Sequence, residues 1–336
     1  MAVNFLWPAV RWPDGNQIER DSAEHFATLH FCEGFDKVTE QQWRECDAIL
    51  SYLEIPEEYR AIMDNCRIFV TPKVGFDNID VKAWGEIGIP VSNVPDYGTM
   101  EVADHAIALM MDLMKGISFH NSELKADIRG NWRPALNPFG RRLSDCVFGV
   151  VGLGRIGTAA ALRAKAFGMD VVFYDPYLSN GADLSVGVRR VDSLGALFAE
   201  SDIVSVHAPL GDETRKLINA DALSHAKPGL VLVNTARGEV IDLDALHDAL
   251  KNNVIQAAGL DVLPVEPADP EHPLIKAWTN DEEWIRHRLV LTPHSAFFTP
   301  ESARDMRYKG GEVAVKYLRD GRLENCVNSA FIKNQR

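Results

Sequence analysis

Short apolar runs alternate with polar, helix-like segments over the first 94 residues. The apolar runs are VNFLW, FATLHF, AILSYL, RIFVTP and PVSNV, and the polar segments are TEQQWREC, PEEYRAIMDNC and DVKAWGEIG. Thr39 with Gln42 forms a candidate capping box, and Asp80 is a candidate helix N-cap. This alternation is typical of βα units, so we expect a parallel sheet with its helices that ends near Val94.

The next segment, residues 98–124, predicts a helix that is apolar on most of its faces between Val102 and Met114. Such a helix must be covered on nearly all sides. We expect Met110, Met111 and Met114 to pack in the protein core, and a contact with another domain or a second subunit is the alternative.

After a link that contains proline and arginine at residues 129–145, the βα rhythm resumes more strongly. Six continuous apolar runs predict strands that are buried on both faces: CVFGVVGLG, DVVFYDP, DIVSVHAP, GLVLVNTAR, AAGLDVL and RLVLTPH. From Glu301 onward the pattern predicts one more helix and a short extended end. A chain of 336 residues with this pattern is expected to form two α/β domains with doubly wound parallel sheets.

The charge balance and the cysteines limit the partners and the location. The chain carries 35 Lys and Arg against 48 Asp and Glu, and its net charge of −13 repels phosphate backbones, so we expect no nucleic-acid partner. No uncharged stretch reaches the roughly 18 apolar residues of a membrane span, and the N-terminus does not resemble a signal peptide. The five cysteines are odd in number and contain no C-x-x-C pair, which favours reduced thiols, no metal site and a cytoplasmic location.

The segment VVGLGRIGTAAALRAKAFGMDVVFYDP has the pattern of a dinucleotide-binding unit. Gly152, Gly154 and Gly157 follow a predicted strand in the spacing G-x-G-x-x-G, and a second predicted strand ends at Asp175. The glycines permit a tight turn and a close approach of backbone N–H groups to a pyrophosphate at the helix N-terminus. A carboxylate at Asp175 would bind the adenosine ribose and repel a 2′-phosphate, so NAD is predicted over NADP. Arg155 either adds charge at the pyrophosphate or faces solvent.

Three polar residues fall at or just beyond the carboxyl ends of predicted strands: Arg237, Glu266 and His294. Open α/β sheets bind ligands at this edge, and a hydride-transferring enzyme needs a substrate anchor and a group that gives or takes a proton. A guanidinium is costly to bury without a partner, so an arginine at a strand end is either exposed or directed at an anion. The three residues together form a candidate catalytic site.

Seven short motifs resemble the D-isomer-specific 2-hydroxyacid dehydrogenase family, and the similarity spans nearly the whole chain. In that family the arginine binds the substrate carboxylate, the histidine is the acid or base, and the glutamate orients and charges the histidine. The resemblance therefore implies that Arg237 binds a 2-oxo acid, that His294 donates a proton as NADH delivers hydride to C2, and that Glu266 stabilises the imidazolium. The motifs are GFDNID (75–80), NVP (93–95), GLGRIG (152–157), HAPL (207–210), NTARG (234–238), DV with EP between 261 and 267, and TPH (292–294).

The same resemblance implies how the chain is divided. Residues 1–98 and 296–336 would form a discontinuous substrate-binding domain, and residues 99–295 an NAD-binding Rossmann domain, with a cleft between the two. Family members are typically dimers joined through the cofactor domain. We therefore expect a homodimer, with the apolar helix after Glu101 as the candidate contact.

Further site residues are carried over with the resemblance. Tyr97 and Phe297 stand where D-lactate-dehydrogenase-like members carry a tyrosine and a phenylalanine over the substrate side chain. Lys73 departs from the family pattern, and either adds a cation that would suit a dicarboxylate or phosphorylated substrate or faces solvent. The implied substrate-binding set is Lys73, Val74, Gly75, Tyr97, Arg237 and Phe297. The implied cofactor-binding set is Gly152, Gly154, Arg155, Ile156, Gly157, Asp175, His207, Pro209, Thr214, Thr235, Ala236, Asp261 and His294.

Two other functions are weighed against this one. A formate dehydrogenase of the same superfamily should carry an amide in place of Glu266, so the glutamate argues against it. An NAD-sensing regulatory protein similar to the C-terminal-binding-protein corepressors stays open, because those proteins retain the three catalytic residues, although they carry a tryptophan in place of Phe297. Residues 268–288 form a long excursion that covers the active site, builds an oligomer contact or only lies on the surface, and the last is favoured.

Overall fold

The computed structural model describes residues 3–10, 12–133 and 139–333. Residues 134–138, within the link expected at 129–145, lie outside the described residues. The chain divides into two compact units, which we call the first and the second unit. The first unit comprises Met1–Gly98 and Phe298–Arg336, and the second comprises Thr99–Phe297.

Within the described residues, the first unit contains a five-stranded parallel sheet of order β2-β1-β3-β4-β5. The predicted capping box at Thr39 and Gln42 and the predicted N-cap Asp80 are both confirmed. The strands are β1 (Asn4–Trp7), β2 (Thr28–Phe31), β3 (Ala48–Leu50), β4 (Ile68–Thr71) and β5 (Val91–Asn93). The α-helices are α1 (Gln17–Ala23), α2 (Glu40–Glu45), α3 (Glu57–Arg60), α4 (Val81–Glu86) and α13 (Pro300–Asp320).

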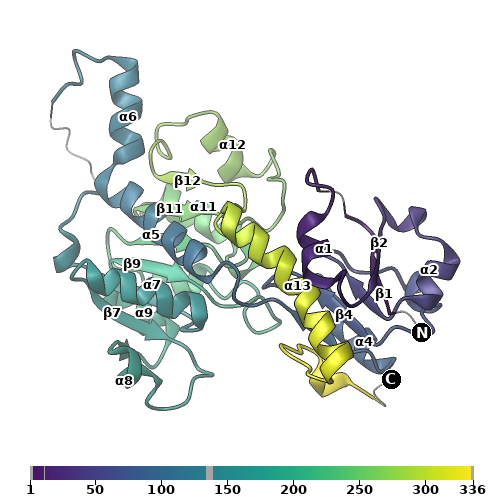
Figure 1. The fold of residues 1–336 in the computed structure, drawn as a ribbon. Helices are drawn as coiled ribbons and strands as arrows, with labels where there is room; N and C mark the ends of the chain where they lie inside the picture. Colours follow the sequence, from purple (N-terminus) through teal and green to yellow (C-terminus); the bar gives the residue numbers. More distant parts are fainter. Residues whose placement is uncertain (1–2, 11, 134–138, 334–336) are drawn as a thin grey trace. The chain divides into compact units, whose positions relative to one another are not determined.

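Helix α13, predicted as the last helix, returns the chain to the first unit and packs against α1 (Figure 1). Arg307 of α13 is buried and donates two hydrogen bonds of 2.6 Å to Glu19 of α1, which is also buried. A buried guanidinium needs such an anionic partner, because burial without one is costly. This ion pair connects the C-terminal helix α13 to helix α1, near the beginning of the chain.

The described part of the second unit contains a seven-stranded parallel sheet of order β12-β11-β10-β9-β6-β7-β8. Alternate residues of β7 enter two separate apolar cores, Val172 on one side and Val171 with Phe173 on the other, so the expected burial of both faces is confirmed. The strands are β6 (Val147–Val151), β7 (Asp170–Tyr174), β8 (Arg189–Arg190), β9 (Ile203–Val206), β10 (Val231–Asn234), β11 (Ala257–Leu260) and β12 (Leu289–Leu291). The α-helices are α5 (Thr99–Lys115), α6 (Ile117–Ala126), α7 (Arg155–Ala166), α8 (Ala182–Val186), α9 (Leu194–Glu200), α10 (Ala220–Ser224), α11 (Leu243–Lys251) and α12 (Pro273–Thr279).

The apolar segment after Glu101 forms two helices rather than one. Helix α5 ends at Lys115 because Gly116 adopts a left-handed conformation with φ 63°, which glycine tolerates at little cost. Helix α5 packs against α7, β10 and β11 of its own unit (Figure 1). Its Met110 and Met114 are buried, and Met111 is partly buried against the same core. The core-packing interpretation of these methionines is therefore confirmed, and the apolar face of α5 is already covered within its own unit.

The excursion at residues 268–288 folds onto its own unit. It contains helix α12, and its Leu274, Ala277 and Ile285 join an apolar core with residues of α11. Trp278 donates a hydrogen bond from its indole Nε1 to the carbonyl of Leu289 at 3.1 Å. The segment is thus more than a surface loop, since it closes the core beside β12.

In the part of the chain that the structure describes, none of the helices is both long and apolar enough to cross a bilayer.

Candidate active site

Arg237, Glu266 and His294 follow three neighbouring strands of the second unit. They come after β10, β11 and β12, which lie side by side in parallel. The carboxyl ends of parallel strands meet at one edge of a sheet, which is where open α/β sheets bind ligands. The topology therefore brings all three residues to the carboxyl edge of one sheet.

The turn that carries Arg237 is fixed by its own backbone. The side chain of Asn234 donates a hydrogen bond to the carbonyl of Arg237 at 2.9 Å and accepts one from the backbone N–H of Ala236 at 2.9 Å. At Gly238 a Cβ would collide with the Leu263 carbonyl group, so only glycine lets this turn approach the next loop so closely. The Arg237 turn therefore lies directly against the loop that leads to Glu266.

His294 and Glu266 form a hydrogen-bonded pair. The Nδ1 of His294 lies 2.7 Å from Oε2 of Glu266, and Oε1 of Glu266 accepts the backbone N–H of Leu263 at 3.0 Å. The carboxylate requires a proton on Nδ1, so Nε2 is the ring atom that can exchange a proton with a ligand. Both side chains are partly exposed, 42% for His294 and 38% for Glu266, so a ligand can reach the pair.

The backbone of His294 is held in an unusual conformation. Its φ of 51° lies in the left-handed region, which costs a residue with a side chain about 1–2 kcal/mol. The buried carboxylate of Asp261 offsets this cost, because it accepts the backbone N–H groups of Ser295 at 2.9 Å and of Ala296 at 3.0 Å. The N–H of His294 itself donates to the carbonyl of Asp261 at 2.8 Å. Asp261 thus anchors the whole turn that presents the imidazole.

Phe297 ends this turn, with its ring 6.3 Å from the ring of His294 in an edge-to-face arrangement. The resemblance implied that Phe297 covers a substrate side chain. Its position beside His294 is compatible with that role.

The glycine motif has the geometry that a pyrophosphate needs. Gly152 follows β6 with φ 87°, and a Cβ on Gly157 would collide with the carbonyl oxygen of Gly152. At Gly154, the N-cap of α7, no described atom beyond its own neighbours lies within 4 Å of where a Cβ would sit. That open space at a helix N-terminus can hold an anion against backbone N–H groups. Arg155 is exposed and Ile156 half-buried at the start of the same helix.

Asp175 follows β7 beside this motif. One of its oxygens accepts the N–H of Leu153 at 3.0 Å and the other that of Tyr177 at 3.0 Å. The carboxylate is therefore tied to the glycine loop. This is the placement that a ribose-binding acid requires in a dinucleotide-binding unit.

Two buried polar atoms at the carboxyl edge have no partner among the described residues: Nδ1 of His207, after β9, and Oγ1 of Thr235, after β10. The other nitrogen of His207 lies 2.8 Å from the Ser205 hydroxyl, and burial lowers the pKa of His207 to about 4, so its ring is neutral at pH 7. A buried polar atom without a hydrogen bond costs about 1–3 kcal/mol. A bound cofactor with polar groups at this edge would remove that cost, so these residues fit a dinucleotide.

The remaining cofactor candidates lie in ordered turns. The Thr214 hydroxyl donates to the carbonyl of Pro209 at 2.6 Å and accepts the N–H of Gly211 at 2.8 Å. Ala236 is half-buried and belongs to the Arg237 turn.

Of the substrate-binding candidates of the first unit, Lys73, Val74 and Gly75 follow β4, and Tyr97 follows the neighbouring strand β5. Lys73 donates to the side-chain oxygen of Asn78 at 2.5 Å, and the Val74 carbonyl accepts a hydrogen bond from the side chain of Asn93 at 2.7 Å. Gly75 is half-buried, and Tyr97 is 8% exposed. The ammonium of Lys73 is thus engaged within its own unit.

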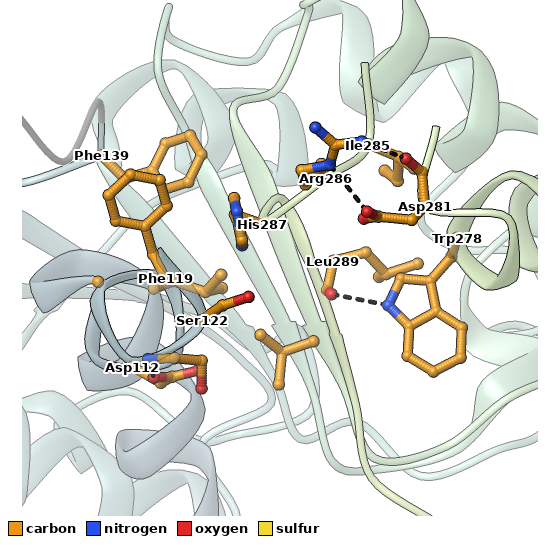
Figure 2. Close-up of a pocket in the computed structure, with 14 residues that line it drawn as sticks. Asp112, Phe119, Ser122, Phe139, Trp278, Asp281, Ile285, Arg286, His287 and Leu289 are labelled. Carbon is orange, nitrogen blue, oxygen red and sulfur yellow. Dashed lines mark hydrogen bonds and ion pairs between the residues drawn. The ribbon is translucent and has the colours of Figure 1, made fainter. Parts of the chain in front are cut away.

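A cavity of about 200 Å³ lies elsewhere in the second unit (Figure 2). It is lined by residues at the junction of α5 and α6 and by Phe139, Trp278, Asp281, Ile285, Arg286, His287, Leu289 and Val290. Leu289 and Val290 place it toward the amino end of β12, away from the edge that carries His294. Its described lining includes none of the candidate site residues, so we do not assign the reaction to it.

Two functional features were missed from the sequence. Asn234 fixes the Arg237 turn, and Asp261, expected only as a neighbour of the cofactor, also anchors the turn of His294. Asn234 lies inside the quoted NTARG motif, so its position was a signal; nothing in the local pattern indicated that the Asp261 carboxylate would accept backbone N–H groups 34 and 35 residues away.

Comparison with known proteins gives the chain its family. The family model "D-isomer specific 2-hydroxyacid dehydrogenase, NAD binding domain" matches residues 107–296. A glyoxylate reductase from Korarchaeum cryptofilum (strain OPF8) is 36% identical over 88% of this chain and 87% of its own length. C-terminal-binding protein 1 from Caenorhabditis elegans is 34% identical over 97% of this chain, but the chain spans only 45% of that protein.

A solved structure shows the same architecture over nearly the full length. It is the D-lactate dehydrogenase from Aquifex aeolicus complexed with NAD and lactic acid, with 29% identity, a TM-score of 0.79, and coverage of 97% of this chain and 99% of that one. The two parallel-sheet units, the glycine motif at a helix N-terminus and the family match agree with one another. The chain belongs to the D-isomer-specific 2-hydroxyacid dehydrogenase family, and residues 107–296 match its NAD-binding domain.

Proposed function

We propose that this protein interconverts a 2-oxo acid and a D-2-hydroxy acid with NAD as the hydride carrier. The observation that carries the proposal is the 2.7 Å pair of His294 and Glu266, which lies at the carboxyl edge of the sheet, beside the turn of Arg237. An oriented acid–base pair and a guanidinium at one edge are what the reduction of a charged carbonyl compound requires.

In this proposal each residue has a separate task. A nicotinamide cofactor, when bound, would supply or accept the hydride at C2 of the substrate. Arg237 holds the substrate carboxylate by charge-assisted hydrogen bonds. In reduction, Nε2 of His294 gives its proton to the carbonyl oxygen, and in oxidation the same nitrogen takes it back. Glu266 keeps the imidazole in one orientation and stabilises its charged form.

The cofactor and the substrate are assigned to different residues. We assign the dinucleotide to the second unit, with the pyrophosphate at Gly152, Gly154 and Gly157. The open space at Gly154 and the unpartnered atoms of His207 and Thr235 support this assignment. The first unit is proposed as the substrate-binding unit, with Lys73, Val74, Gly75 and Tyr97 as its contributions.

The test is the oxidation of NADH at 340 nm across a panel of 2-oxo acids that includes dicarboxylic and phosphorylated members. Turnover that vanishes in a His294→Ala variant supports the proposal and ranks the substrates. NADH binding without turnover of any member counts against it.

The C-terminal-binding protein match favours one second candidate, an NAD-sensing regulatory protein. Such a protein would bind NADH and change its affinity for a protein partner, whereas an enzyme would turn over a 2-oxo acid. Partner capture with and without NADH separates the two functions.

Replacing Asp175 with asparagine is expected to reduce the preference for NADH over NADPH by about tenfold or more. The carboxylate favours ribose hydroxyls and repels a 2′-phosphate, and asparagine removes the negative charge while keeping an acceptor for a backbone N–H. Fluorescence titration with both cofactors measures the ratio. Asp170→Asn, an exposed position at the start of the same strand, is the control, and an unchanged ratio in the Asp175 variant would refute the assignment.

We also propose a cytoplasmic homodimer joined through the second unit. The free thiols of all five cysteines support a reducing compartment.

Since the apolar face of α5 is covered, the dimer contact is assigned to α6 and the residues after it, where Ile117, Ile128 and Trp132 expose more than half of their surface. Light scattering should give twice the mass of 37.4 kDa, and a monomer would contradict the assignment.

A further inference from the structure

A chain of hydrogen bonds connects helix α5 to the turn that carries His294. Nε2 of His105, in α5, lies 2.9 Å from the hydroxyl of Thr292, and that hydroxyl donates to Oδ1 of Asp261 at 2.6 Å. Asp261 in turn accepts the N–H groups of the two residues that follow His294. All these residues belong to the second unit, so the chain runs within one compact body.

The hydrogen-bond directions in this chain are determined. The hydroxyl of Thr292 has one proton, and the Asp261 carboxylate can only accept, so the proton points to Asp261. The oxygen of Thr292 must then accept from His105, which places a proton on Nε2 of His105. His105 lies 3.7 Å from the same carboxylate oxygen and is 24% exposed, whereas the side chain of Asp261 is 1% exposed. His105 is therefore the donor that holds the Thr292 hydroxyl toward a desolvated carboxylate.

The carboxylate of Asp261 accepts several hydrogen bonds at the same time. Oδ1 accepts from both Thr292 and the N–H of Ser295, and Oδ2 accepts from the N–H of Ala296. A rotation of this carboxylate would break the contacts that keep His294 in its left-handed conformation. Thr292 fixes the rotation, and His105 fixes Thr292.

We propose that His105 is a positioning residue for the reaction: through Thr292 and Asp261 it sets the orientation of the turn that presents the His294 imidazole. The inference rests on the proposed function for its kinetic consequence, but its structural content does not. His105 touches neither substrate nor cofactor in this role. It determines where Nε2 of His294 lies relative to the substrate oxygen, and a misplacement of about 1 Å in such a group costs on the order of a hundredfold in rate.

Two pairs of variants test the inference, each with a conservative partner. His105→Asn removes the donor, and His105→Gln restores an N–H near the position of Nε2. Thr292→Val removes the hydroxyl, and Thr292→Ser keeps it. The expected result is a kcat about 10–100-fold lower in the Asn and Val variants, recovery in the Gln and Ser variants, and unchanged NADH affinity. The double variant His105→Asn/Thr292→Val should be no slower than the worse single variant, because both break the same chain.

A second readout does not depend on activity. Hydrogen exchange of the peptide that spans residues 292–297 reports the N–H groups of Ser295 and Ala296, and we expect exchange at least tenfold faster in the Asn and Val variants, with β10 unchanged. The control is Asp104→Asn, the neighbouring position on α5, where the exposed side chain pairs with Arg163.

The outcomes are distinct. If the wild-type protein turns over none of the 2-oxo acids, the proposed activity fails, and the exchange rates alone decide whether His105 holds the turn. A lower melting temperature with unchanged kcat and unchanged exchange at 292–297 would make His105 a purely structural residue and would overturn the inference. Loss of kcat without rescue by Gln or Ser would overturn it as well.

Discussion

Replacing Arg237 with glutamine is expected to lower kcat/KM for the 2-oxo acid by about 10²–10⁴-fold. The guanidinium would make two charge-assisted hydrogen bonds to the substrate carboxylate, each contributing about 1.5–3 kcal/mol. Glutamine has neither the positive charge nor the two parallel N–H donors of the guanidinium. The loss should appear in both KM and kcat, because a substrate held without its carboxylate anchor is also poorly oriented for hydride transfer.

The turn itself should survive this change. It is held by the side chain of Asn234 and by the close approach at Gly238, which remain in the variant, although the hydrogen bond from Nη1 of Arg237 to the carbonyl of Ala236 at 2.7 Å is lost. Steady-state kinetics on the best substrate of the panel gives the effect, and the melting temperature should stay within a few degrees of the wild-type value. Arg237→Lys keeps the positive charge but lacks the two parallel N–H donors, so it should recover only part of the activity.

The matched control is Arg189→Gln, which removes an exposed arginine of β8 that pairs with Glu200. It should leave kcat/KM unchanged. If the Arg237 variant behaves like this control, Arg237 does not contact the substrate, and the carboxylate anchor must be sought among the residues of the first unit.

Local patterns were sufficient for most of the fold. Continuous apolar runs predicted the six longer strands of the second unit, and helix signals placed Thr39 and Asp80 correctly, because caps and strands depend on neighbours in sequence. Strand β8 was missed since two residues, Arg189 and Arg190, give no period to detect. The break at Gly116 was missed because the apolar pattern continues through it. What changes at this position is the backbone conformation, which the pattern does not report.

The sequence predicted which residues form the candidate site, but not how their side chains and loops contact one another. Strand order places Arg237, Glu266 and His294 at one edge once the sheet is known to be parallel. Their contacts, however, depend on the path of loops, such as the turn at 292–296 and the close approach of Gly238 to Leu263. The link from His105 to Asp261 joins residues 156 positions apart in the sequence. In the sequence alone, His105 is merely one of several polar residues on a largely apolar helix.

Helix α5 illustrates the same limit. Its apolar faces favoured core packing, with a contact to a second subunit as the alternative, and the structure buries them against α7, β10 and β11. A hydrophobic pattern reports that a face is buried and does not say by what. The exposed apolar side chains of the described residues include Ile117 of α6 and, beyond it, Ile128 and Trp132, where we propose the oligomer contact.

Replacing His294 with glutamine is expected to lower kcat by about 10²–10⁴-fold while the affinity for NADH stays within a few fold of wild type. The imidazole is the proton donor to the carbonyl oxygen, and an amide of similar size fills its place without exchanging a proton near neutral pH. The terminal amide of glutamine reaches the position of Nε2, so the variant keeps a polar group toward the substrate but loses both the proton transfer and the contact of Nδ1 with Oε2 of Glu266.

Single-turnover oxidation of bound NADH in a stopped-flow instrument isolates the step in question, because it separates the transfer from product release. Glu266→Gln should cause a smaller loss, since an amide still accepts a hydrogen bond from Nδ1 but does not stabilise the imidazolium. The double variant should be about as slow as His294→Gln alone, because Glu266 acts only through the histidine. If the double variant is instead slower by the product of the two single effects, Glu266 acts on the substrate or the cofactor directly, and its assignment as the partner of His294 fails.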